Sequence, residues 1–266
     1  MNEVKPRMLK GRSALITGST AGIGYAVAER LAAAGCNIVL NGIEREAEIT
    51  DKIAALKARN VDVLYDGANV GDAAQVEAMV AAANARFGGV DVLVNNAVTR
   101  LFGLIEDTSP ADWDRAMAVN LNSAFNTIRC TMPGMKARNW GRIVNMSSIY
   151  GMIGAANRAS YVVAKTGLIG LTRAVAMETL EHEITCNAIC PGSVNTTHSS
   201  RVIKTTMDEH GLSEQEAVGR FLAGKQPSGR FIAPESVAEF VAFLCGPAGR
   251  DINGAVLPVD LAWSAS

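Results

Sequence analysis

Short apolar runs of strand character alternate along this chain with longer stretches of helical spacing, and this alternation constrains the fold most. The strand-like runs are Ser13–Thr17, Asn37–Leu40, Val61–Tyr65, Val90–Val94, Arg142–Asn145, Ile184–Cys190 and Ala255–Val259. The helical stretches between them are Tyr25–Ala34, Glu44–Arg59, Ala73–Phe87, Ala111–Lys136, Ser160–Leu180, Thr196–Ala223 and Pro234–Leu244. Successive strand–helix units form a parallel sheet with helices on both faces. We therefore expect one α/β domain over residues 1–266, with a doubly wound parallel sheet of about seven strands.

Composition excludes several classes of protein. The 266 residues carry 25 Lys and Arg against 26 Asp and Glu, a balance that disfavours a nucleic-acid-binding surface. No apolar run approaches the roughly 20 residues of a membrane-spanning helix, and no secretory signal is visible. The five cysteines are scattered, with no C-x-x-C pair, and are typical of free thiols in a reducing compartment. We expect a cytoplasmic protein without a metal site.

A strand–helix alternation also fits an eight-fold barrel, and the first turn distinguishes the two folds. Residues 17–24 read TGSTAGIG, directly after a strand and at the start of a helix. Glycines there let the backbone approach a pyrophosphate, whose charge is stabilised by the N–H groups at the helix start. A tight turn alone also requires glycine, so the motif needs support from other residues.

That support comes from Tyr161 and Lys165, which lie four residues apart and therefore on one face of a helix. A nearby ammonium favours the phenolate and makes a tyrosine usable as an acid or base near neutral pH. Polar or turn-forming residues also follow several strands, namely Thr17, Asn95 with Asn96, Ser148, and Pro191 with Gly192. The carboxyl ends of the strands are where open α/β sheets bind ligands.

With these residues in place, the chain resembles the short-chain dehydrogenase/reductase family over nearly its whole length. The matching motifs are Thr17-Gly18-x-x-x-Gly22-Ile23-Gly24, Asn95-Asn96-Ala97, Asn120, Ser148, Tyr161-x-x-x-Lys165 and Pro191-Gly192-x-Val194-x-Thr196. The resemblance implies a Rossmann-like fold, a nicotinamide cofactor and a helical substrate lid at about 196–224. It also implies a catalytic tetrad in which Tyr161 exchanges a proton with the substrate, Ser148 holds the substrate oxygen, Lys165 lowers the tyrosine pKa and binds ribose, and Asn120 anchors a water.

The resemblance also implies the cofactor contacts. They are Gly18, Thr20, Gly22, Ile23, Gly24, Asn69, Val70, Asn95, Ala97, Tyr161, Lys165, Pro191, Gly192, Val194 and Thr196. An acid after the second strand would accept the adenosine ribose hydroxyls, and an arginine would hold a 2′-phosphate. Asn41-Gly42-Ile43 provides neither, and Ala21 is not the basic residue common in NADP-preferring members. We expect NAD rather than NADP, with Arg45 as the one residue that could reverse this preference.

Within the family the chain is most similar to bacterial D-3-hydroxybutyrate dehydrogenases, through segments such as Asn187–Gly192 and Lys225–Ser228. The departures cluster around the expected substrate site, where Arg100, Tyr150, Arg158, Ser193 and Val202 replace the residues of that subfamily. The substrate-binding residues that we expect are Arg100, Ser148, Tyr150, Arg158, Tyr161, Ser193 and His198. If the two arginines face the pocket, the substrate is an anionic hydroxy acid or hydroxysulfonate, larger or differently shaped than hydroxybutyrate.

The alternatives follow from the same residues. If the arginines point into solvent, the substrate is a neutral polyol, sugar or cyclic alcohol. A non-enzymatic alternative is an NAD-binding sensor or scaffold. A serine hydrolase lacks its G-x-S-x-G elbow, and His182-Glu183 has no second histidine one turn on for a metal. The apolar faces of Ala111–Lys136 and Ser160–Leu180, together with the family resemblance, predict a homotetramer.

Overall fold

Seven parallel strands form one sheet in residues 8–265, the part of the chain that the computed structural model describes. The strands are β1 (Ser13–Ile16), β2 (Asn37–Asn41), β3 (Val63–Asp66), β4 (Val92–Asn95), β5 (Gly141–Met146), β6 (Ile184–Pro191) and β7 (Val256–Val259). Their order is β3-β2-β1-β4-β5-β6-β7, so the direction of progression reverses between β1 and β4. All six pairings are parallel, and every strand therefore ends at the same edge. The doubly wound Rossmann-like fold is confirmed.

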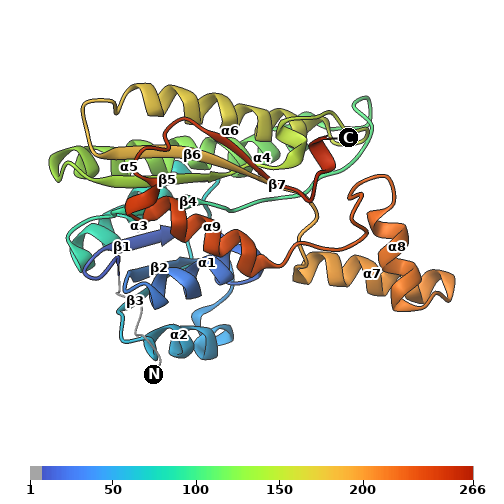
Figure 1. Ribbon diagram of the computed structural model, residues 1–266, viewed down its shortest axis with the longest axis horizontal. Coiled ribbons are helices and arrows are strands. Elements are labelled where there is room, and N and C mark those ends of the chain that lie inside the picture. Colours follow the sequence, from blue (N-terminus) through green and yellow to red (C-terminus); the bar gives the residue numbers. More distant parts are fainter. Residues whose placement is uncertain (1–7, 266) are drawn as a thin grey trace.

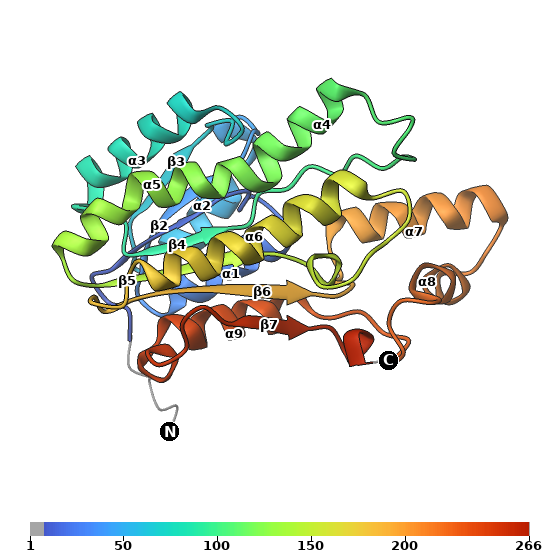
Figure 2. The same cartoon turned by 90° about the horizontal axis from the view of Figure 1, so that it is seen from above.

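Helices cover both faces of the sheet (Figure 2). On one face lie α1 (Gly22–Ala33), α2 (Thr50–Lys57) and α9 (Pro234–Cys245). On the other lie α3 (Ala73–Phe87), α5 (Ser123–Ala137) and α6 (Ala159–Met177). Alternate strand side chains supply the two cores: Ile16 packs toward α1 and α9, whereas its neighbour Leu15 packs toward α3 and α5. None of the helices in these described residues has the length and apolar character needed to cross a bilayer.

The long helix predicted at Ala111–Lys136 is interrupted. It consists of α4 (Pro110–Met117), a π-helical turn at Ala118–Asn122, and then α5. It begins at Pro110, one residue before the predicted start, and the Ser109 side chain caps it by accepting a hydrogen bond from the Asp112 N–H at 3.1 Å. Apolar spacing does not reveal a π-turn, since it inserts one residue without ending the helix; such turns are frequent at functional sites.

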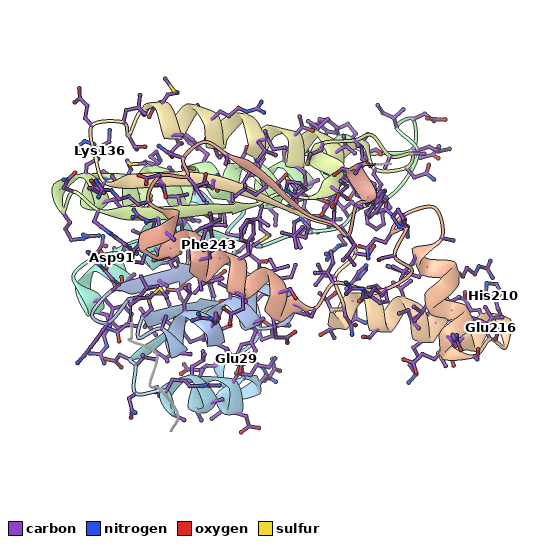
Figure 3. The ribbon with its side chains drawn as sticks, viewed as in Figure 1. Glu29, Asp91, Lys136, His210, Glu216 and Phe243 are labelled. Atoms are coloured by element: carbon purple, nitrogen blue, oxygen red, sulfur yellow. The ribbon has the colours of Figure 1, made fainter. Side chains whose placement is uncertain are left out.

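The polar stretch predicted at Thr196–Ala223 is two helices, α7 (Thr197–His210) and α8 (Glu214–Leu222), which we call the α7–α8 arm. Gly211 ends α7 with φ +64°, a conformation that favours glycine, and Ser213 then caps α8. Figure 1 shows the arm projecting from the main body beyond β7. His210 and Glu216 mark its outer end in Figure 3, away from the sheet.

The turns after β1 and β4 are joined by hydrogen bonds at the carboxyl edge of the sheet. The Thr17 hydroxyl oxygen accepts from the backbone N–H groups of Asn96 and Ala97, at 2.9 and 3.0 Å. The Asn96 amide donates back to the carbonyls of Thr17 and Gly18, at 3.0 and 2.8 Å. A Cβ on Gly18 would lie 2.8 Å from the Ala97 Cα, so only glycine permits this approach. The join places the glycine-rich turn against the end of β4.

Candidate active site

A cavity of about 490 Å³ lies at the carboxyl ends of the central strands, between the sheet and the α7–α8 arm. Ser148 reaches it from the end of β5, Tyr161 and Lys165 from α6, and Arg100 from the loop after β4. The residues predicted from the sequence that line it are Ile23, Arg100, Ser148, Tyr150, Arg158, Tyr161, Lys165, Pro191, Gly192, Ser193, Val194, Thr196 and His198. The fold therefore brings residues from five separate segments into one site.

Lys165 is the most deeply buried charged residue of this cavity, with 2% of its surface exposed. Its Nζ donates to the Met146 carbonyl at 2.7 Å and lies 5.6 Å from the centre of the Tyr161 ring. Burial, followed by the charge of Arg100, lowers the pKa of Lys165 to about 7. Ser147, next to the predicted Ser148, donates to the Lys165 carbonyl at 2.8 Å and ties α6 to β5.

Ser148 and Tyr150 form the wall beside Tyr161. The Ser148 Oγ accepts from the Tyr150 N–H at 3.2 Å, and this leaves the hydroxyl proton of Ser148 available to another acceptor. The Tyr150 ring meets the rings of Tyr161 and Trp263 edge to face, with centroids 6.4 and 5.3 Å apart. These contacts fix the orientation of the aromatic wall.

Asn120 lies in the π-helical turn and is not part of the cavity wall. Its side-chain oxygen accepts from the Thr99 N–H at 2.8 Å, and its amide nitrogen donates to the Thr99 carbonyl at 2.9 Å. The side chain thus holds the loop that carries Arg100. The role that the sequence predicted for Asn120, anchoring a water, stays a prediction; the structure adds that its side chain fastens this loop.

Two basic residues are stacked on aromatic rings in the wall. The Arg158 guanidinium carbon lies 4.0 Å from the Phe102 ring centre and 5.2 Å from that of Tyr150. The Lys225 Nζ lies 4.2 Å from the Phe221 ring centre. Burial and then Arg158 lower the pKa of Lys225, and burial, Arg100, Arg201 and Arg158 lower that of His198. These cations therefore face a shared space.

The glycine-rich turn forms the second part of the site. Gly22 has φ +56° and lies opposite Thr196, whose methyl group would be 3.4 Å from a Cβ at that glycine. With glycine at this position, no side chain covers the start of α1, and such a glycine-rich turn suits the pyrophosphate of a dinucleotide. Asn69 is exposed and accepts from the Gly71 N–H at 3.0 Å, whereas the adjacent Val70 is buried. The residues present fit a nicotinamide dinucleotide.

Asn95, for which the sequence suggested a cofactor contact, has a structural role through its side chain. Its side chain accepts from the Thr127 hydroxyl at 2.6 Å and donates to Asn145 at 2.9 Å, and Asn145 in turn donates to Thr172. All four residues are buried, and they link α5, β4, β5 and α6 in one chain. The Asn95 side chain thus holds the sheet and helices together beneath the site.

The loop after β2 contains an acid that the sequence analysis overlooked. The Glu44 carboxylate accepts a hydrogen bond from the Thr20 hydroxyl of the glycine-rich turn at 2.9 Å. The Tyr65 hydroxyl donates to the carbonyls of Gly42 and Glu44 and holds this loop in place of the helix predicted from Glu44 onward. Arg45 turns away and forms an exposed pair with Glu48 at 2.6 Å.

Other cavity residues were also missed: Phe102, Phe221, Lys225 and Trp263. Lys225 lies in a segment shared with the hydroxybutyrate dehydrogenases, and this shared segment was the one sequence signal that could have identified it. The other three residues reach the site from a loop, from the α7–α8 arm and from the segment after β7, whose courses the apolar periodicity does not determine.

We predict that Lys165 gives the cofactor-free protein a pH-dependent stability. From about pH 7 to pH 8, folded Lys165 loses a proton that the unfolded chain keeps, so the free energy of unfolding should rise by about 1 kcal/mol. Urea unfolding at the two pH values measures this rise. The Lys165→Met variant should lack it, and an equal rise in both proteins would contradict the assignment.

Comparison with known proteins agrees with the fold and the cavity described above. Residues 18–262 match the family model described as enoyl-(acyl carrier protein) reductase. A D-beta-hydroxybutyrate dehydrogenase of Cupriavidus necator is 40% identical over 97% of this chain and 100% of its own length; one of Rhizobium meliloti is 40% identical over 96% and 99%. The crystal structure of levodione reductase superposes with a TM-score of 0.86 at 32% identity, covering 97% of this chain and 99% of that one. The chain belongs to the short-chain dehydrogenase/reductase family, whose enzymes act on CH–OH groups.

Proposed function

We propose that this protein interconverts a secondary alcohol and its carbonyl compound with NAD, and that the substrate is a small anionic hydroxy acid or hydroxysulfonate. One observation carries the proposal. The cavity that holds Ser148 and Tyr161 is lined by Arg100, Arg158, Lys165 and Lys225, and no Asp or Glu lines it in the described part of the chain. A wall of this kind favours a negatively charged ligand. It gives no reason to prefer a neutral polyol, sugar or cyclic alcohol.

The chemistry divides among three side chains. Tyr161 exchanges a proton with the substrate oxygen. Ser148, whose Oγ accepts from the Tyr150 N–H, donates its hydroxyl proton to the same oxygen. Lys165 in its charged form places a positive charge 5.6 Å from the centre of the Tyr161 ring, beside the proton-exchanging group. The nicotinamide of a bound cofactor would supply or accept the hydride. Because these groups share one cavity, turnover is a better account than a sensor or scaffold role.

Glu44 and Arg45 support NAD over NADP. Glu44 lies against Thr20 of the glycine-rich turn, where its carboxylate can accept from the adenosine ribose hydroxyls and repel a 2′-phosphate. Arg45, which could have reversed the preference, is held by Glu48. Glu44, a few residues after the end of β2, thus supplies the acid that would accept from the ribose hydroxyls of NAD.

We also propose that the α7–α8 arm is the substrate lid and that the protein is a cytoplasmic homotetramer. The cavity that holds Ser148 is also lined by His198 and Phe221 of the arm and by the following Lys225, as expected of a lid. Phe125 on α5 and Met177 on α6 are 52% and 68% exposed, so both helices have apolar surface for subunit contact. The cysteines, all free, suit a reducing compartment.

We predict NAD reduction with an anionic alcohol in a spectrophotometric panel of hydroxy acids, hydroxysulfonates, polyols and cyclic alcohols. The Tyr161→Phe variant should lower kcat by about 10²–10⁴-fold, because it removes the proton-exchanging group. Its NAD affinity, measured separately by fluorescence, should change little if Tyr161 acts mainly in catalysis. Turnover of neutral alcohols alone would contradict the proposed substrate class. Unchanged turnover in Tyr161→Phe would contradict the assigned acid and base.

The Glu44→Ala variant should lower the ratio of kcat/KM for NAD to that for NADP by about 10- to 100-fold, since it removes charge-assisted hydrogen bonds and the repulsion of a 2′-phosphate. Glu46→Ala is the matched control, because Glu46 is an exposed acid on the neighbouring turn. An unchanged ratio in Glu44→Ala, or an equal fall in the control, would rule out Glu44 as the source of selectivity.

A further inference from the structure

A second cavity, of about 440 Å³, lies between the α7–α8 arm and the end of the chain. Figure 2 shows the last turn of the chain beside α8. Residues from three segments line the cavity, among them Ile153 after β5, Leu222, Ala223 and Pro227 at and after the end of α8, and Trp263 after β7. Lys225 and Trp263 also line the cavity that holds Tyr161, so these two residues form the boundary between the two cavities.

Two uncharged polar side chains line the second cavity, and both already have partners within the protein. The Gln226 oxygen accepts from the Ser193 N–H, and the Gln226 nitrogen donates to the Arg230 carbonyl. The Ser264 hydroxyl donates to the Asp260 carboxylate. In residues 8–265, Lys225 is the one charged residue that lines this cavity. A lining of this kind suits an apolar group of a ligand.

Lys225 contributes its charge to one cavity and its stem to the other. Its Nζ lies 4.2 Å from the ring centre of Phe221, which lines the active-site cavity and not the second one. The charged end of Lys225 therefore belongs to the active-site cavity, and its apolar stem is left to line the second cavity. A long, flexible stem at the boundary can move aside for a ligand that crosses it.

Trp263 is the fixed side of the same boundary. Its ring meets the Tyr150 ring edge to face at 5.3 Å, and its N–H donates to the Asp260 carbonyl at 3.1 Å. The two preceding residues, Leu261 and Ala262, have φ +52° and +66°. Non-glycine residues keep this costly conformation only where the surrounding structure holds them in it. Trp263 thus offers a ligand a rigid apolar surface that runs from the aromatic wall of the active site into the second cavity.

The protein leaves the second cavity unfilled because glycines line part of it. A Cβ added at Gly219, Gly224 or Gly229 would meet no atom within 4 Å. Gly219 lies within α8, where its backbone is helical and a larger residue could replace it. The space is therefore available to a ligand and can also be closed by substitution.

Resting on the proposed function, we propose that the substrate is a hydroxy acid with an apolar chain, and that this chain extends past Trp263 into the second cavity. Its charge would then lie among the cations of the active-site cavity, and its chain against the apolar lining beyond the boundary. Each methylene that such a chain buries would strengthen binding by about three- to fourfold. A 3-hydroxybutyrate has a single methyl group beyond its hydroxyl carbon and offers no such chain.

Calorimetric titration of the NAD-saturated protein with butanoate, hexanoate and octanoate tests the inference, because these acids carry the same charge and differ only in chain length. Octanoate should bind at least about tenfold more tightly than butanoate, with hexanoate between them. The probes carry no hydroxyl group, so the result does not depend on turnover. Equal affinities for the three acids would overturn the inference and point to a neighbouring subunit as the occupant of the second cavity.

Variants locate the chain. Gly219→Leu and Ala223→Leu place side chains in the second cavity, so each should reduce the preference for octanoate over butanoate to within about threefold. Leucine is more favourable than glycine in a helix, and Gly219→Leu should therefore keep α8 folded. Arg220→Leu is the matched control, because Arg220 is an exposed neighbour on α8 that lines neither cavity, and it should keep the preference. Retention of the preference in both filling variants would overturn the assignment of the chain to this cavity.

Turnover separates this inference from the proposed function. We expect kcat/KM to be higher for 3-hydroxyoctanoate than for 3-hydroxybutanoate, and Gly219→Leu should lose this difference. If hydroxy acids are oxidised but chain length changes neither binding nor kcat/KM, the proposed function stands and the inference fails. If octanoate is preferred as predicted but only neutral alcohols are oxidised, the second cavity accepts a chain and the proposed anionic substrate fails.

Discussion

The hydrogen-bonded join between the turns after β1 and β4 is the contact on which the site depends. The strand order reverses at this point, so the connections leave the sheet toward opposite faces and open a crevice between the two turns. Thr17 and Asn96 form hydrogen bonds with backbone groups that would otherwise lack partners in the crevice. Gly18 permits the close approach of the two turns. With the turns fixed, the glycine-rich cradle lies beside the loop that carries Arg100.

A second consequence of the fold is the concentration of positive charge beside the reacting groups. The parallel strands place Ser148 and the Arg100 loop at one edge, α6 adds Tyr161 and Lys165, and the residues after the arm add Lys225. The lowered pKa of Lys165 reports both its burial and the charge of Arg100. An anionic substrate would offset this repulsion and favour the charged lysine, which couples substrate charge to the acid–base chemistry of Tyr161.

Much of this architecture could be predicted from sequence because its signals are local. Strand residues such as Leu15 and Ile16 are buried on opposite faces, and the spacing of Tyr161 and Lys165 fixes their shared helix face. The π-turn at Asn120 was not predictable, since one inserted residue shifts the apolar spacing without ending the helical pattern. Glu44 was missed for another reason: Tyr65, distant in sequence, holds its loop against Thr20. Lys225 was not predicted as a cavity residue because its position depends on the path of the chain through the arm.

The central claim is that a cation-lined cavity selects a negatively charged alcohol for oxidation at Tyr161. Comparing kcat/KM for a hydroxy acid that the enzyme oxidises with that for the carboxamide of the same acid tests this claim most directly, because shape is kept and charge is removed. We predict that the acid is preferred by at least about 100-fold, as expected for a lost charge-assisted pair. Equal kcat/KM values for acid and carboxamide would contradict the account.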